Sequence, residues 1–136
     1  MRNSTKILAA SDKELMIISA CLQDALISLK DASFDAKNKK FSFLATRYQW
    51  EKSDSKKGLR THTAVAFENI DKVETANLNL PQKVSHNLSL LNISVEKEYL
   101  ILTFSENVKI RLKTSQLKVK LRDEGAPWPA KVPSHL

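Results

Sequence analysis

The side chains that could do chemistry are few and widely spaced in this sequence. The three histidines, His62, His86 and His135, never stand three or four positions apart, the spacing that puts two metal ligands on one helix face. The only cysteine, Cys21, falls inside a predicted helix, where no helix N-terminus would stabilise its thiolate. We interpret Cys21 as a small, buried apolar side chain and predict no metal site.

The patterns of nucleotide and acid–base enzymes are also missing. A phosphate-cradling loop needs several glycines, and Gly58 and Gly125 are the only two in 136 residues. Asp24, Asp31 and Asp35 lie close together in sequence, but aspartate favours helix ends and turns, which explains them without a catalytic carboxylate pair. We therefore expect no cofactor and no catalytic residue, and an enzyme is the least favoured class.

One stretch of aromatic residues around Arg47 has the composition of a binding surface. Phe41, Phe43, Tyr48 and Trp50 could form a base-stacking platform on an open sheet. Side chains alternate between the two faces of a strand, so Phe41 and Phe43 share one face. Without a bulge, Tyr48 and Trp50 lie on the opposite face. The alternative to a base-stacking platform is that the aromatic side chains on at least one of these faces fill the core.

The net charge of +7 is concentrated in two segments. Eight basic and two acidic residues lie between Lys37 and Arg60, and six basic residues with no acid lie between Asn107 and Arg122. Such segments suit an anionic partner, namely nucleic acid or a phospholipid surface, or else a simple solvated surface. The pattern leaves open whether both segments share a face. The residues of a candidate basic patch are Lys39, Lys40, Lys56, Lys57, Arg60, Lys109, Arg111 and Lys113.

A short strand at 6–10 and then one amphipathic helix are predicted near the N-terminus. Ser11 and Glu14 form a capping box, in which each side chain accepts a hydrogen bond from the other residue's amide. Helical spacing of apolar residues predicts a helix from about Asp12 to Asp24. Met16 and Ile17 widen its apolar stripe, so we expect a well-covered helix. The stripe itself is Leu15, Ile18, Leu22 and Ala25.

Most of the remaining chain alternates between apolar and polar residues, as half-buried strands do. The expected strands cover 26–30 with 33–35, 41–50, 61–73, 88–95, 99–104 and 108–113. We expect a mobile loop at 52–60 and a proline-containing tail at 126–136, because prolines preclude regular structure there. Segment 115–123 is ambiguous: its alternation slightly favours a strand, whereas Thr114 or Ser115 as a cap and Gly125 as a stop favour a helix.

The length fits a single domain over residues 1–136. One cysteine cannot close an internal disulfide, and the first residues resemble neither a signal nor a transit peptide. No apolar run approaches the roughly 20 residues that span a bilayer. We therefore expect a cytoplasmic protein without a transmembrane segment.

Four strings of residues resemble an uncharacterised family of short, mainly alphaproteobacterial proteins, a domain of unknown function. They are Ser19-x-x-x-Gln23-Asp24-Ala25, Arg47-Tyr48-x-Trp50-Glu51, Asp123-x-Gly125-x-Pro127-Trp128 and Pro133-x-His135. The resemblance covers nearly the whole chain. Where the family commonly has Asn-Arg-Phe, this chain has Thr46-Arg47-Tyr48. No activity of the family carries over.

The resemblance favours a helix at Ser115–Asp123. The predicted fold is α+β: a strongly twisted or barrel-like antiparallel meander of about six to seven strands, with an N-terminal helix and a short C-terminal helix. This arrangement is similar to the pleckstrin-homology-like architecture, an analogy that does not fix function. Gln23, Asp24, Arg47 and Trp50 are the candidate residues for a ligand or partner site. The structural alternative pairs Asp24 with Arg47 at the helix–sheet junction and packs Trp50 beneath.

We expect a non-catalytic binding or adaptor module for a protein or an anionic surface. The alternative is a nucleic-acid-associating protein that uses both basic segments, whose affinity would fall steeply with salt.

Overall fold

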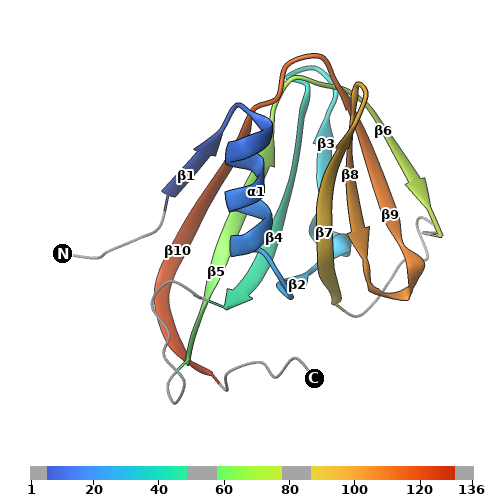
Figure 1. The fold of residues 1–136 in the computed structure, drawn as a ribbon. Helices are drawn as coiled ribbons and strands as arrows, with labels where there is room; N and C mark the ends of the chain where they lie inside the picture. The colour runs from blue at the N-terminus through green and yellow to red at the C-terminus, as the bar shows by residue number, and fades with distance from the viewer. Residues whose placement is uncertain (1–5, 49–57, 78–86, 131–136) are drawn as a thin grey trace.

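The computed structural model describes residues 6–48, 58–77 and 87–130, and in these ranges it shows one α-helix and a sheet of ten antiparallel strands (Figure 1). The elements are β1 (Lys6–Ala9), α1 (Asp12–Cys21), β2 (Leu26–Ile27), β3 (Ser33–Asp35), β4 (Lys40–Tyr48), β5 (Gly58–Phe67), β6 (Ile70–Ala76), β7 (Leu88–Glu96), β8 (Tyr99–Phe104), β9 (Lys109–Thr114) and β10 (Val119–Ala130). The α+β class is confirmed, and the strands outnumber the six to seven expected.

The sheet folds back on itself but does not close. Its strands run in the order β1-β10-β5-β4-β2-β7-β8-β9-β6, with β3 paired to β4, so β1 and β6 are its two ends. The half containing β10, β5 and β4 faces the half containing β7, β8 and β9 (Figure 1). The two-residue strand β2 pairs with both β4 and β7 and therefore joins the halves.

The strand expected at 61–73 is two strands that lie in different halves of the sheet. Asn69 adopts a left-handed conformation with φ of 61°, which asparagine tolerates better than most residues, and the chain turns there. The amide of Glu68 donates to the carbonyl of Lys118 at 2.8 Å, and that of Ile70 donates to Lys39 at 2.9 Å. These two bonds hold the turn against the segments before β10 and before β4. Because β5 and β6 follow each other in the chain but do not pair, the sheet is not a simple meander.

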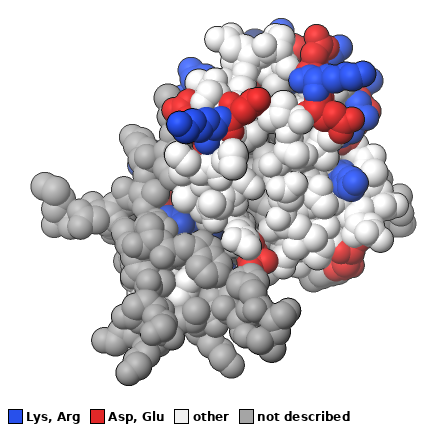
Figure 2. Space-filling view, in the orientation of Figure 1, with Lys and Arg blue, Asp and Glu red and all other residues white. Residues whose placement is uncertain are grey.

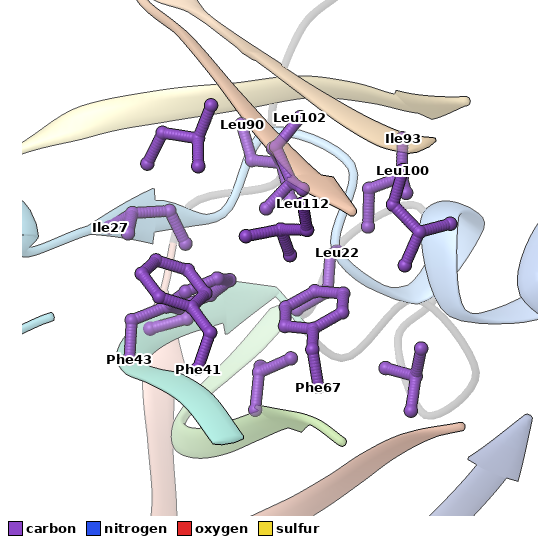
Figure 3. Packing of buried hydrophobic residues seen from close by; sticks show 14 of the residues in the cluster. Leu22, Ile27, Phe41, Phe43, Phe67, Leu90, Ile93, Leu100, Leu102 and Leu112 are labelled. Atoms are coloured by element: carbon purple, nitrogen blue, oxygen red, sulfur yellow. The ribbon is translucent and has the colours of Figure 1, made fainter. Parts of the chain in front are cut away.

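The core fills the space between the two halves. Three phenylalanines from β4 and β5 meet there: the ring centroid of Phe67 lies 6.2 Å from that of Phe41 and 5.9 Å from that of Phe43. Leucines and isoleucines of β7, β8 and β9 face them from the other half (Figure 3). The helix adds the buried residues Leu15, Ile18 and Leu22 to this cluster, as its spacing predicts.

The helix begins where the capping box places it. The Ser11 hydroxyl accepts a hydrogen bond from the Glu14 amide at 3.2 Å. The Glu14 carboxylate reaches back one residue further than expected and accepts from the amide of Ala10 at 3.1 Å. It also accepts from the Ser11 hydroxyl at 3.0 Å, which gives a double link across the first turn.

The helix ends at Cys21, three residues before the predicted end. Asp24 takes a left-handed conformation with φ of 61°, and its amide donates to the carbonyl of Leu90 in β7 at 3.1 Å. This bond to a neighbouring strand replaces a further helical turn. The helices in the described ranges are not long and apolar enough to cross a membrane.

The predicted C-terminal helix at 115–123 is wrong, because β10 begins at Val119. Val119 and Leu121 are buried, whereas Lys120 and Arg122 point outward, which is the alternation that the sequence shows. β10 lies between β1 and β5 and pairs with both. Non-local pairing on two sides therefore outweighs the local capping signals. The pleckstrin-homology-like analogy depended on that closing helix and does not hold without it.

Two segments expected to lack regular structure are partly strand. Within the expected loop at 52–60, residues from Gly58 onward belong to β5, while 52–57 lie outside the described residues. Within the expected tail at 126–136, β10 continues to Ala130, and 131–136 lie outside the described residues.

Pro127 fits in β10 because the strand is irregular at its position. The register with β5 shifts between Glu124 and Trp128, and regular pairing resumes with Trp128 opposite Arg60. Proline has no amide hydrogen to give to a ladder and is tolerated at bulges and strand edges. Pro127 falls inside this shift, so it interrupts the pairing without ending the strand.

Glu68 ties the β5–β6 turn to β10 through two lysines. Its carboxylate lies 3.2 Å from the ammonium of Lys118 and 3.3 Å from that of Lys120. Partial burial raises the pKa of Glu68, but the hydrogen bonds and charges of the two lysines outweigh it and lower the pKa overall.

We expect Glu68→Gln to destabilise the protein at neutral pH by up to about 1 kcal/mol, the usual range for partly exposed ion pairs. Because the folded-state pKa of Glu68 is lowered, its contribution exists above the ordinary value of 4.5 and is lost as the pH falls through the folded pKa. Urea denaturation from neutral to acid pH should show the variant converging on the wild type. Glu96→Gln, at an exposed strand end, is the control, and a gap that persists in acid would contradict the prediction.

Candidate binding surfaces

A buried ion pair crosses three strands of one half of the sheet. Nε and Nη2 of Arg47 donate to the two carboxylate oxygens of Asp123 at 2.8 and 2.6 Å, a bidentate arrangement. The hydroxyl of Thr63 donates to the same carboxylate at 2.8 Å. Arg47 is 0% exposed and Asp123 is 3% exposed. The site is therefore a charged cluster inside the fold.

The strand register brings these residues together. Ala45 of β4, Thr63 of β5 and Asp123 of β10 stand side by side, and Arg47 lies two residues along β4. Residues two apart point to the same face of a strand, so all their side chains point inward. The predicted partner of Arg47 was Asp24, whereas the structure gives it Asp123, a residue 76 positions away.

The candidate residues that the structure describes do not form one site. Gln23 is exposed just after α1, and Asp24 beside it is half-buried. Arg47 is fully buried, so it could act on a partner only through the strands that it joins. Trp50 lies outside the described residues. Only Gln23 lines a surface depression.

That depression is a groove between α1 and β7, with a volume of about 500 Å³. Its apolar side chains include Met16, Leu91 and Val95, which are 73%, 52% and 42% exposed. Figure 2 shows an uncharged area in the middle of this face, with charged side chains gathered mainly toward its top. The residues lining the groove are Asp12, Leu15, Met16, Ser19, Ala20, Gln23, Leu91, Asn92, Ile93, Ser94 and Val95.

The groove corrects one expectation about the helix. Met16 and Ile17 were expected to be covered, but they are 73% and 54% exposed. The apolar stripe of α1 is wider than the surface that the sheet covers. An apolar pair beside an already complete stripe was the signal in the sequence that could have revealed this groove.

A second depression, of about 340 Å³, lies on the outer face of β4, β5 and β10. Lys40, Lys120 and Arg122 stand around it together with Asp31 and Glu124. Two alanines of β5, Ala64 and Ala66, form part of its floor. The register explains the grouping, because Ala66 pairs with Lys120 and Ala64 with Arg122. Members of both basic segments therefore meet on one face here.

The other basic candidates lie apart from this depression. Lys39 is 3.1 Å from Asp71 of β6, and Arg60 donates to the carbonyl of Thr46 at 3.4 Å. Lys109, Arg111 and Lys113 all lie on β9 in the other half of the sheet. Lys56 and Lys57 lie outside the described residues.

Arg111 on β9 already interacts with two side chains of the fold. Its guanidinium lies 3.9 Å from the ring centroid of Tyr99 in a cation–π interaction, and 3.9 Å from the carboxylate of Glu74. The basic segment after Asn107 is thus divided between β9, where Arg111 has these neighbours, and the start of β10.

Fold and surfaces together define an α+β protein with an open antiparallel sheet, a buried ion pair, an apolar groove beside α1 and a depression lined by basic residues on the outer face. The chain belongs to the family described as Protein of unknown function (DUF2948), whose model matches residues 5–135. The expected membership in an uncharacterised family is confirmed. Comparison with curated proteins and with solved structures gave no match.

We expect Arg47→Ala to destabilise the protein by about 3–5 kcal/mol, because it leaves the buried Asp123 carboxylate without its cation. Chemical denaturation measures the loss directly. Arg122→Ala, next to Asp123 but on the outer face, should stay within about 0.5 kcal/mol of wild type.

A triple variant, Arg47→Met with Asp123→Leu and Thr63→Val, removes the buried charges together with the hydroxyl that bonds to them. It should recover much of the stability that Arg47→Ala loses, because neither charge of the pair is then left buried without the other. Wild-type stability of Arg47→Ala would contradict the role given to this ion pair.

Proposed function

We propose that this protein is a non-catalytic binding module that holds a protein partner in the groove between α1 and β7. The observation that carries the proposal is the groove itself, a concave surface of about 500 Å³ between α1 and β7 that exposes apolar side chains. Single exposed apolar residues on a surface need no explanation, whereas a concave group of them does.

The side chains of the groove suit a protein ligand. Met16 is unbranched and flexible, which lets it adapt to the shape of a bound segment. Leu91 and Val95 face it from β7, and burying three such side chains supplies a hydrophobic contribution that grows with the area removed from water. Ser19 and Asn92 at the same groove offer polar atoms that can fix the orientation of the ligand.

A cytoplasmic location belongs to the same proposal. Cys21 is the only cysteine, and it packs partly buried against the core. The chain therefore forms no internal disulfide of the kind that stabilises many secreted domains.

We expect Met16→Glu to abolish retention of the partner, because it puts a charge into an apolar interface. The measurement is affinity capture from the lysate of the source cell with wild type and variant, at low and moderate salt and after nuclease treatment. Phe34→Glu is the control: it changes a residue of β3 that is 36% exposed and lines neither the groove nor the basic depression. Equal retention by all three proteins would contradict the groove as the binding surface.

Association with nucleic acid is the second candidate, supported by the convergence of Lys40, Lys120 and Arg122. Ala64 and Ala66 between them leave room for a phosphate backbone to approach the sheet. Asp31 and Glu124 also line this depression, and Lys120 neighbours Glu68, so Lys40 and Arg122 are the side chains best suited to bind phosphates.

For this candidate, affinity for single-stranded DNA or RNA should fall linearly with salt on a double logarithmic scale, because bound phosphates release counterions. Lys40→Gln with Arg122→Gln should weaken binding and reduce the slope by about one for each phosphate that the variant no longer neutralises. Lys109→Gln, on the other half of the sheet, is the matched control. Binding that ignores salt, measured by fluorescence anisotropy, would exclude a phosphate-driven mode.

A further inference from the structure

The groove borders a length of β7 whose backbone edge is open. β8 pairs with β7 from Leu90 to Glu96 on one side. On the other side, β2 pairs only with Leu88 and Ser89. The chain before β2 extends this pairing by one residue, since the amide of Leu90 donates to the carbonyl of Ala25 at 2.9 Å.

Beyond Leu90 the neighbouring chain leaves the sheet. Asp24 donates its amide to the carbonyl of Leu90, and the residues before it turn away into α1. Among the described residues, no strand pairs with 91–96 on this side. The helix stands beside the open edge and forms the opposite wall of the groove.

The register identifies which backbone groups the edge offers. A two-residue turn joins β7 to β8, so Glu96 and Tyr99 on either side of it form a hydrogen-bonded pair. Along an antiparallel ladder, hydrogen-bonded pairs alternate with non-hydrogen-bonded pairs. A residue of a non-hydrogen-bonded pair directs its N–H and C=O away from the partner strand. Val95 and Ile93 occupy those positions, so their backbone groups point to the open edge.

We propose that the partner contributes an extended segment that adds to β7 as a further strand along residues 91–95. This inference rests on the proposed function. Its backbone would pair with the N–H and C=O groups of Ile93 and Val95. Alternate side chains would enter the groove beside Met16 and Leu91. This mode of recognition draws affinity from main-chain hydrogen bonds and specificity from every second side chain.

The charge of the groove indicates the chemistry of the segment. Asp12 is the one charged residue among the described residues that line it, and neither lysine nor arginine is present. Glu98 and Asp12 also line the adjoining depression at the end of β7, together with Lys97. This locally acidic end in a basic protein fits an apolar segment that carries a lysine or arginine there.

Two substitutions at Val95 separate backbone pairing from side-chain packing. Val95→Pro removes the outward amide, and its ring adds bulk at the edge, while the bonds to β8 come from neighbouring residues. Val95→Ala keeps the amide and removes most of the side chain. The probe is a set of eight-residue peptides selected from a displayed random library on the wild-type full-length chain. We expect Val95→Pro to weaken peptide binding at least about 50-fold, because it removes a strand hydrogen bond and its ring blocks close approach of the peptide backbone. Val95→Ala should weaken binding less than about 10-fold, because it keeps that hydrogen bond.

Hydrogen exchange on the unaltered protein gives a test that does not depend on a variant folding. The amides of Ile93 and Val95 should exchange quickly in the free protein, because they point to an open edge. Addition of a selected peptide should slow both by at least about 10-fold, as pairing protects an amide from solvent. The amide of Ser94, which points to β8, serves as the internal reference and should change little.

A selection that yields no peptide sensitive to Val95→Pro, with unchanged exchange at Ile93 and Val95, would overturn strand addition. Dimerisation of the protein alone that Val95→Pro abolishes would also overturn it, since the occupant would then be a second copy. Failure of strand addition can be told apart from failure of the groove as a binding surface. If Met16→Glu loses a partner from the lysate and Val95→Pro fully retains it, the groove remains the binding surface. Only the proposal of strand addition is then overturned.

Discussion

The pairing of Arg47 with Asp123 is the interaction on which most of the architecture depends. It joins β4 to β10 across β5, and β10 is the strand that carries β1. The helix follows β1 after two residues, so the position of α1 is fixed through β1 by the placement of β10. A buried ion pair rarely adds much net stability over apolar packing, yet removal of either partner is costly. Here it links two strands, β4 and β10, that are not neighbours in the sheet.

The groove and the open strand edge arise from a single feature of the chain. Between the end of α1 and β4 the polypeptide pairs with β7 over a very short length, because β2 has only two residues and Asp24 turns back toward the helix. A longer β2 would cover the edge of β7, and a shorter connection would not place the helix beside it. The same geometry thus leaves backbone groups exposed on one wall and apolar side chains on the other.

The sequence predicts those parts of this fold that depend on local pattern. The capping box at Ser11, the apolar stripe of α1 and the alternation in β9 each depend on a few neighbouring residues, and each is found. The failures are non-local. The helix predicted at 115–123 follows capping signals, whereas β1 and β5 supply pairing on both sides of β10. Asp123 could not be assigned to Arg47, because nothing local relates residues that stand 76 positions apart. The exposure of Met16 likewise depends on how much of the helix the sheet happens to cover.

The two candidate surfaces lie on opposite sides of one layer of strands, and this placement allows both to be used together. In β10, Leu121 and Asp123 point into the core and the ion pair, while Lys120 and Arg122 point outward to the basic depression. The groove beside α1 lies on the inner side, where the helix packs. A partner in the groove therefore does not cover the basic depression. The charges differ as well: the one charged residue among the described residues of the groove is a carboxylate, whereas three cations and the carboxylates of Asp31 and Glu124 line the depression. Salt should therefore weaken an anionic ligand on the outer face far more than an apolar segment in the groove, since only the former depends mainly on charge.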